Sequence, residues 1–201
     1  MKWSLPAITL LVAISTAACG QSMEQPDIRF NPHPKMRYEI TLKIEGIPGP
    51  LDAVEASAGY VVANEACVPL TPFIGATLPP EKRMPIVLTK LDDTTYRGEI
   101  YVDQMQDADY FGLGLCRWSM ISAGFGLERG NAVFVHSLWL ADILGNKTIT
   151  RYFNNLSYVG DYAKSRKDEH PFADYGRADR AGFKDPANSF SVTLTARERF
   201  Q

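Results

Sequence analysis

The sequence predicts a mainly β protein, built as an antiparallel β-sandwich or a partly open barrel. Several segments alternate apolar and polar residues with a period of two, and turn residues separate them. Helical periodicity is confined to one short segment. Short strands that recur with turns between them favour two packed sheets. We therefore expect one β-rich globular domain over residues 36–201, which is long enough to bury a core.

The first expected strands lie in the amino-terminal half of this domain. Residues 37–45 place Tyr38, Ile40, Leu42 and Ile44 on one face and polar residues on the other. Residues 53–64 resume the extended pattern, and residues 84–103 read as a hairpin that turns at Asp92 and Asp93.

The remaining expected strands follow a glycine-containing stretch. Residues 113–127 form a long apolar segment, which we interpret as a central strand with a bend or bulge near Gly124 or Gly126. Residues 131–138 and 188–200 supply two more strands.

Helical signal is limited to residues 137–146, where Ser137 is a possible cap and Gly145 a possible terminator. The stretch from residue 159 to 188 is charged and rich in glycine and aspartate, and we expect a long loop there.

Residues 1–18 have the pattern of a signal peptide. One cation, Lys2, precedes an uncharged apolar run that ends in small residues. The run is about half the length that a membrane-spanning helix needs. Ordinary cleavage after Ala18 would leave the next residue, Cys19, as a free thiol.

The segment "TAAC", residues 16–19, resembles the lipobox of bacterial lipoproteins, although Thr16 stands where that family usually has leucine. The resemblance implies that Cys19 is linked to diacylglycerol and becomes the first residue of the mature chain. Gly20 in place of aspartate implies sorting to the outer membrane, on its periplasmic face. Residues 19–35 are proline-rich and predict a flexible tether.

The chain has three cysteines, so lipidation of Cys19 leaves Cys67 and Cys116 as one pair. We expect a disulfide between them, which would stabilise the fold by roughly 4 kcal/mol on the chain-entropy model. Metal ligation is disfavoured because close-spaced cysteines and histidines are missing.

Charge and motif content exclude several functions. The 21 Lys and Arg balance 23 Asp and Glu, so no basic stripe predicts a nucleic-acid partner. The three histidines, His33, His136 and His170, lie in no catalytic motif. We expect neither enzymatic activity nor a cofactor.

The densest polar cluster precedes the central strand. Asp103, Asp107 and Asp109 could offer oxygens to calcium, but their spacing does not match an EF-hand, and capping of a tight turn is the simpler interpretation. The adjacent Tyr110 and Phe111 are candidates for exposed anchors of a protein interface, with Asp107 and Asp109 as its rim, or for a plug at the end of the sandwich.

The cysteine at position 116 should face its partner, so Trp118, two residues later, should point inward beside the bond.

Taken together, "RYEITLKIEGIPGPLDAVEA", "CVPLTP", "DADYFGLGLCRW" and "FSVTLTARE" resemble a group of small outer-membrane lipoproteins. Some lipoproteins of this type resemble immunity proteins, which implies a binding module that neutralises an antibacterial effector. One alternative is a structural or accessory lipoprotein that binds peptidoglycan or an assembly partner. Another is an envelope hydrolase that uses carboxylates such as Asp107 and Glu99.

Overall fold

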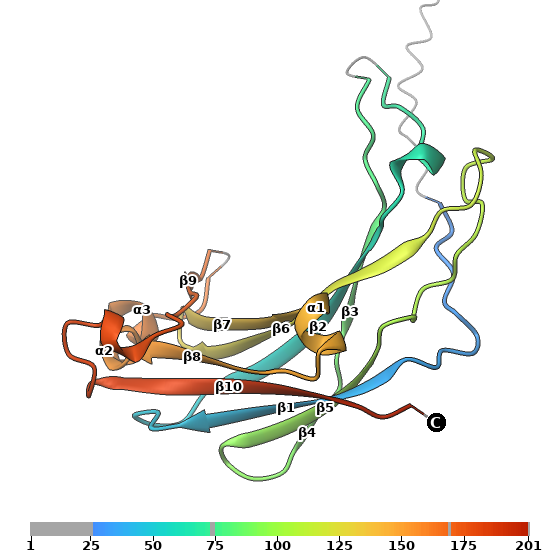
Figure 1. The fold of residues 1–201 in the computed structure, drawn as a ribbon. Helices are drawn as coiled ribbons and strands as arrows, with labels where there is room; N and C mark the ends of the chain where they lie inside the picture. The colour runs from blue at the N-terminus through green and yellow to red at the C-terminus, as the bar shows by residue number, and fades with distance from the viewer. Residues whose placement is uncertain (1–25, 73–74, 169, 201) are drawn as a thin grey trace, which may run out of the picture.

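The computed structural model describes residues 26–72, 75–168 and 170–200, and it confirms the predicted β-sandwich (Figure 1). Two five-stranded sheets pack face to face and do not close into a barrel. The predicted signal peptide and Cys19 lie outside the described residues. Among the residues that are described, no helix has the length and apolar character needed to cross a membrane.

The first sheet has the strand order β4-β5-β1-β10-β8, and the second has the order β3-β2-β6-β7-β9. All pairs are antiparallel except β7 with β9. The first sheet contains β1 (Arg37–Glu45), β4 (Leu88–Lys90), β5 (Thr95–Tyr101), β8 (Thr148–Asn154) and β10 (Ser189–Glu198). The second contains β2 (Ala53–Val62), β3 (Glu81–Pro85), β6 (Trp118–Arg129), β7 (Ala132–Trp139) and β9 (Phe172–Asp174).

The core lies between the sheets and follows from the alternation in the strands. One side of β1 is buried, as are the facing residues of β10, β6 and β7. At one end of the core, Phe134 packs edge-on against Phe153 and Phe190 with ring centroids 5.6 and 5.1 Å apart, and it stacks on Tyr158. This aromatic cluster joins the two sheets.

The predicted hairpin over 84–103 is correct for β4 and β5, whereas its first residues belong to the other sheet. β3 pairs with β2, and the chain crosses between the sheets at Ile86. Gly98 of β5 permits this crossing, because a Cβ there would lie 2.6 Å from a methyl carbon of Ile86.

The bulge predicted near Gly124 or Gly126 lies elsewhere. Gly59 pairs with Ser122 and Tyr60 with Met120, so Ile121 is the extra residue in β6. Both glycines of the prediction stay in regular register with β7. The strand also begins at residue 118 rather than 113, because the preceding residues belong to a projecting loop.

More helix is present than the single short helix predicted. α1 (Leu140–Leu144) ends before Gly145 as expected, but Ser137 lies within β7 and does not cap it. α2 (Asn155–Val159) and α3 (Asp161–Lys164) follow β8. The predicted loop over 159–188 therefore contains α3, β9 and the 3-10 turn η2 (Arg180–Gly182).

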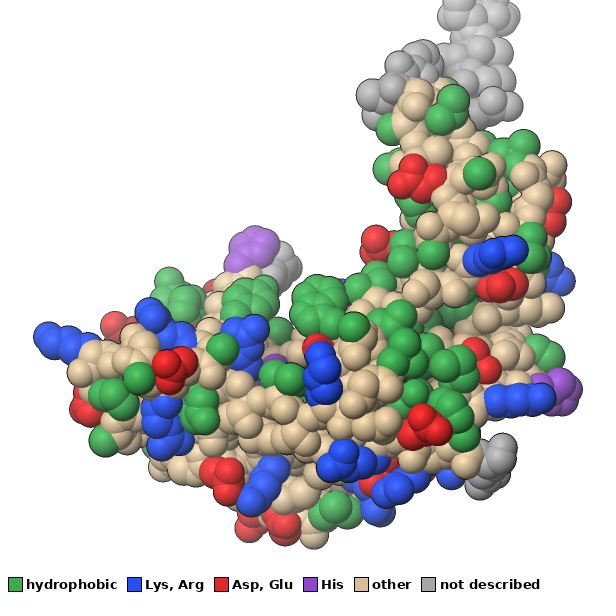
Figure 2. Space-filling model, in the orientation of Figure 1, with side chains coloured by type: hydrophobic (Ala, Val, Ile, Leu, Met, Phe, Trp, Pro, Cys, Tyr) green, Lys and Arg blue, Asp and Glu red, His purple; other side chains and the backbone are tan. Residues whose placement is uncertain are grey.

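The second sheet continues beyond the sandwich into a projecting arm, which we define as residues 63–72, 75–80 and 104–117 (Figure 1). The arm extends the ends of β2, β3 and β6 and includes the 3-10 turn η1 (Glu65–Cys67). It rises on the same side as the outer face of the second sheet, so the molecule has an L-shaped outline (Figure 2).

Candidate functional site

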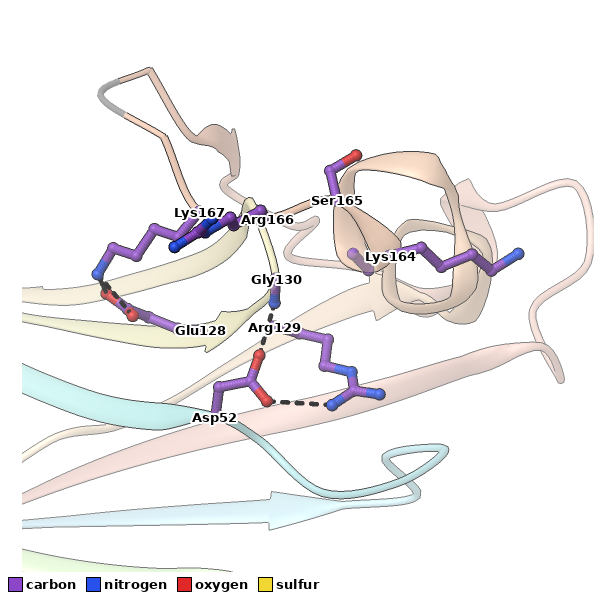
Figure 3. Close-up of a pocket in the computed structure, with 9 residues that line it drawn as sticks. Asp52, Glu128, Arg129, Gly130, Lys164, Ser165, Arg166 and Lys167 are labelled. Carbon is purple, nitrogen blue, oxygen red and sulfur yellow. Dashed lines mark hydrogen bonds and ion pairs between the residues drawn. The ribbon is translucent and has the colours of Figure 1, made fainter.

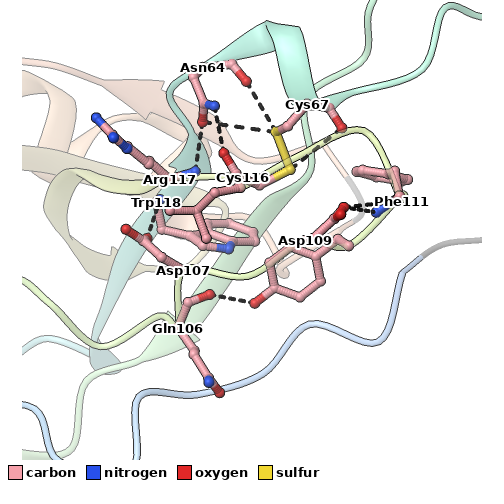
Figure 4. Close-up of a disulfide and its surroundings, with 12 residues drawn as sticks. Asn64, Cys67, Gln106, Asp107, Asp109, Phe111, Cys116, Arg117 and Trp118 are labelled. Carbon is pink, nitrogen blue, oxygen red and sulfur yellow. Dashed lines mark hydrogen bonds between the residues drawn. A yellow bond between two sulfur atoms is a disulfide. The ribbon is translucent and has the colours of Figure 1, made fainter.

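The predicted disulfide is present and braces the arm (Figure 4). Cys67 and Cys116 lie with Cα atoms 5.3 Å apart, and their bond joins η1 to the segment before β6. Both are buried, together with Val62 and Val68, in a small cluster separate from the main core. The bond therefore holds a part of the molecule that has little apolar packing of its own.

Asn64 is a second brace, which sequence reasoning missed. Its amide nitrogen donates to the carbonyl oxygen of Leu115 at 2.8 Å, and its Oδ1 accepts from the backbone N–H of Arg117 at 2.6 Å. The side chain thus joins the two halves of the arm beside the disulfide (Figure 4). An asparagine at the end of the extended segment 53–64, three residues before Cys67, was the available signal.

The carboxylates proposed for calcium or for an interface rim hold the backbone instead. Asp107 accepts from the N–H of Trp118 at 2.8 Å, and Asp109 accepts from the N–H of Gly112 at 2.7 Å. Asp103 accepts from the N–H groups of Lys35 and Met36, each at 2.9 Å. Within the described ranges, no group of three potential ligands is placed to hold a metal ion.

Tyr110 and Phe111 are half-buried against the disulfide rather than fully exposed. The Tyr110 ring meets Trp118 edge-on at 6.3 Å, and its hydroxyl donates to the carbonyl of Gln106. Trp118 packs inward beside the bond, as expected. These aromatic residues therefore pack around the disulfide within the arm, and they neither stand out as exposed anchors nor plug the end of the sandwich.

The described part of the predicted tether, residues 26–35, is docked along the arm. The carbonyl of Arg29 accepts from the N–H of Gln106 at 3.0 Å, and the N–H of Asn31 donates to Gln104 at 2.9 Å. The guanidinium of Arg29 lies over the Tyr110 ring at 5.7 Å. Any free tether is therefore shorter than the sequence suggested.

The three histidines lie apart from one another in the fold. His33 and His170 are exposed, whereas His136 is buried in β7, with Nε2 3.0 Å from the carbonyl oxygen of Ile149. Burial lowers the pKa of His136, because it disfavours the charged form of the imidazole. The carboxylates suggested for a hydrolase are also separated: Glu99 pairs with Arg37 on the first sheet, and Asp107 belongs to the arm.

The outer face of the second sheet is uncharged across its centre. The strand register places small or apolar residues there, and we call this set the uncharged face: Ser57, Gly59, Ser122, Gly124, Gly126, Val133, Val135, Ser137 and Trp139. The tryptophan is 61% exposed. Charged residues border this set: Arg83 lies opposite Gly59, Glu55 lies opposite Gly126, and Glu128 pairs with Lys167 at one end of the sheet. Figure 2 shows the hollow angle between the arm and the body on this side of the molecule.

A shallow pocket of about 520 Å³ lies at that charged end, between the start of β2, the β6–β7 turn and α3 (Figure 3). Asp52 binds the N–H of Gly130 at 2.7 Å and Arg129 at 3.1 Å, and the amide hydrogen bond lowers its pKa. Both oxygens of Glu128 accept from Lys167 at 2.7 Å. Since the carboxylates are already paired, we assign the pocket a structural role in holding α3 against the sheet.

No family model matches this chain, and neither does any curated protein or solved structure.

Proposed function

We propose that this protein is a lipid-anchored, periplasm-facing binding module that captures a protein partner on the uncharged face. The partner is an exported antibacterial effector, which the module neutralises by covering it. The anchor is the acylated Cys19, for which the lipobox-like "TAAC" is the support.

One observation carries the proposal: the two outer faces of the sandwich differ in charge. The first sheet exposes ion pairs such as Glu39 with Arg97 and with Arg199, as a solvated face does. The uncharged face lacks charge at its centre and has an exposed tryptophan at its edge. Depletion of charge with an aromatic anchor is the pattern of the core of a protein interface.

Photo-crosslinking in the native host tests the proposal. A benzoyl-phenylalanine replaces Val135 on the uncharged face or, as the matched control, Thr41 on the outer face of the first sheet. We expect an adduct of one defined mass at position 135 and none at position 41, with the captured protein identified by mass spectrometry as an exported toxin. Equal labelling at both positions, or an adduct only at position 41, contradicts the proposal.

Competition between strains tests neutralisation itself. A strain that lacks the gene should be killed by sister cells that secrete the effector, and the wild-type gene should restore survival. Complementation with Ser122→Arg should fail, because an arginine in the centre of the uncharged face blocks a flat interface. Unchanged survival of the deletion strain removes the effector as the partner.

A further inference from the structure

We infer that a small pocket at the start of β1 binds a phosphate group. The pocket is lined by Pro34, Lys35, Arg37, Tyr101 and Arg199, and we call it the basic pocket. Arg37 and Tyr101 are register partners on the outer side of the first sheet, whereas the uncharged face belongs to the second sheet. The inference therefore does not depend on the proposed function.

The lining of the basic pocket is positively charged. It contains three cations and no carboxylate. Lys35 forms no ion pair with any residue that the structure describes. Arg37 has Glu99 as its partner at 3.6 Å. Arg199 has Glu39 at 3.3 Å, and that glutamate is shared with an arginine of β5.

These ion pairs leave the arginines able to bind a further anion. Each guanidinium carries five N–H donors, of which one carboxylate contact at this distance occupies few. Ion pairs between exposed side chains also contribute little free energy, so an anion in the pocket does not have to displace a strong interaction.

Hydrogen bonds hold the three cations on neighbouring segments. The N–H of Arg199 donates to the carbonyl of Arg37 at 2.8 Å, and Nε of Arg37 donates to the carbonyl of Arg199 at 3.2 Å. The carboxylate of Asp103 accepts from the N–H groups of Lys35 and Met36, each at 2.9 Å. Figure 1 shows the end of β10 beside the start of β1. The fold therefore brings the positive charges together before a ligand binds, which reduces the ordering that binding requires.

The number of cations and the size of the pocket favour phosphate. A phosphate monoester carries a charge of about −1.5 to −2 near pH 7 and offers three acceptor oxygens, so several cations can share it. Arginine binds phosphate through two parallel hydrogen bonds, and lysine binds it as a point charge. The volume of about 250 Å³ is below the roughly 300 Å³ at which pockets for drug-sized ligands begin. The basic pocket therefore fits one phosphate group rather than a large organic molecule.

Two sources could supply this phosphate group. One is the headgroup of a membrane lipid, and the other is a free phosphate. Both present the same oxygens to the three cations, so the experiment has one arm for each source.

Nuclear magnetic resonance of the full chain, labelled with ¹⁵N and held in micelles of an uncharged detergent, tests the inference. Inorganic phosphate is the first probe, added at constant ionic strength. Phosphatidic acid mixed into the micelles is the second, because its headgroup is a phosphate monoester. Lys35→Gln and Arg199→Gln each remove one charge from the basic pocket. Lys43→Gln, the matched control, removes one charge from the same strand six residues beyond Arg37.

We expect the amide signals of Lys35, Arg37 and Tyr101 to shift to a plateau as a probe is added. The half-saturating concentration should rise about tenfold in Lys35→Gln and in Arg199→Gln, since each loses a charge-assisted contact, and Lys43→Gln should titrate as the wild type does. Unchanged signals from β8 in each variant show that the fold is intact.

The two probes separate the sources of the phosphate group. Saturation by inorganic phosphate identifies a free phosphate as the ligand, and saturation by phosphatidic acid alone identifies a lipid headgroup. No saturable shift with either probe, or equal weakening by Lys43→Gln, overturns the inference. The proposed capture of an effector is unaffected by either result, because it is measured on the other sheet.

Discussion

The outer face of the first sheet carries Glu39, Thr41 and Arg97 at its centre, whereas that of the second sheet carries Gly124, Gly126 and Val135. Both faces lie over the same core and arise from the same alternation of inward and outward residues. Folding requires only that the inward-facing residues be apolar. The outward-facing residues can therefore vary with the function of the protein. The difference between the faces therefore reports function more than stability.

The largest loss of stability is expected from a substitution in the core that lies beneath both outer faces. Phe134→Ala deletes a fully buried ring that contacts Phe153, Phe190 and Tyr158, and it should lower the free energy of unfolding by about 3–5 kcal/mol. Urea denaturation followed by far-UV circular dichroism measures this loss. A change below about 1 kcal/mol would show that the aromatic cluster does not join the sheets.

The second largest loss of stability should come from the arm, which extends the second sheet beyond the sandwich. Joint replacement of Cys67 and Cys116 by serine should cost about 2–4 kcal/mol, since it frees a loop whose ends are 49 residues apart in the sequence.

Hydrogen exchange locates that loss. Amides of residues 63–72, 75–80 and 104–117 should lose protection, whereas those in the paired strands β1 and β10 should keep most of theirs. Uniform loss across both sheets would contradict an arm that is held separately from the core.

A pH effect should arise from the inward side of the second sheet. Burial lowers the pKa of His136 below its usual value of about 6.5, so the unfolded chain binds a proton that the folded chain does not. Stability is therefore full above about pH 6.5 and falls as the pH drops below it, with a slope of at most about 1.4 kcal/mol per pH unit.

Denaturation midpoints of the wild type and His136→Gln, measured between about pH 7.5 and 5.5, check this window. The variant keeps a donor for the carbonyl of Ile149 but has no titrating group. Its midpoint should change less than that of the wild type, and parallel curves would assign the pH dependence to other residues.

The smallest change in stability is expected from substitutions on the two outer faces, which should affect binding without affecting folding. Ser122→Arg on the uncharged face and Thr41→Arg on the charged face should each change the free energy of unfolding by less than about 0.5 kcal/mol, because both side chains point outward. Thermal denaturation of the two variants and the wild type measures these changes. A large loss for Ser122→Arg alone would mean that the uncharged face serves stability.

The core and the disulfide could be predicted because each has a recognisable pattern in the sequence. The period-two pattern around Ile40 and Val192 shows which side of each strand is buried. The pairing of Cys67 with Cys116 followed from the parity of the cysteines. β8 was missed because Arg151 occupies an inward-facing register position opposite Val192, which interrupts the alternation.

The uncharged face could not be predicted in the same way. Gly59, Ser122 and Ser137 become neighbours only through the register of three strands, and the bulge at Ile121 shifts that register. Asp109 caps a local turn by accepting from the N–H of Gly112, as the turn interpretation expected. The bond from the N–H of Trp118 to Asp107, by contrast, depended on the path of the arm backbone, which no local pattern specifies.

The most direct test of the account is the affinity of the captured partner for two arginine variants, measured by calorimetry with the purified proteins. Ser122→Arg should weaken binding by about 100-fold, as expected for a charge forced into the centre of an interface, and Thr41→Arg should leave it unchanged. Equal weakening by the two substitutions, or loss of binding with Thr41→Arg alone, would contradict the assignment of the uncharged face as the binding surface.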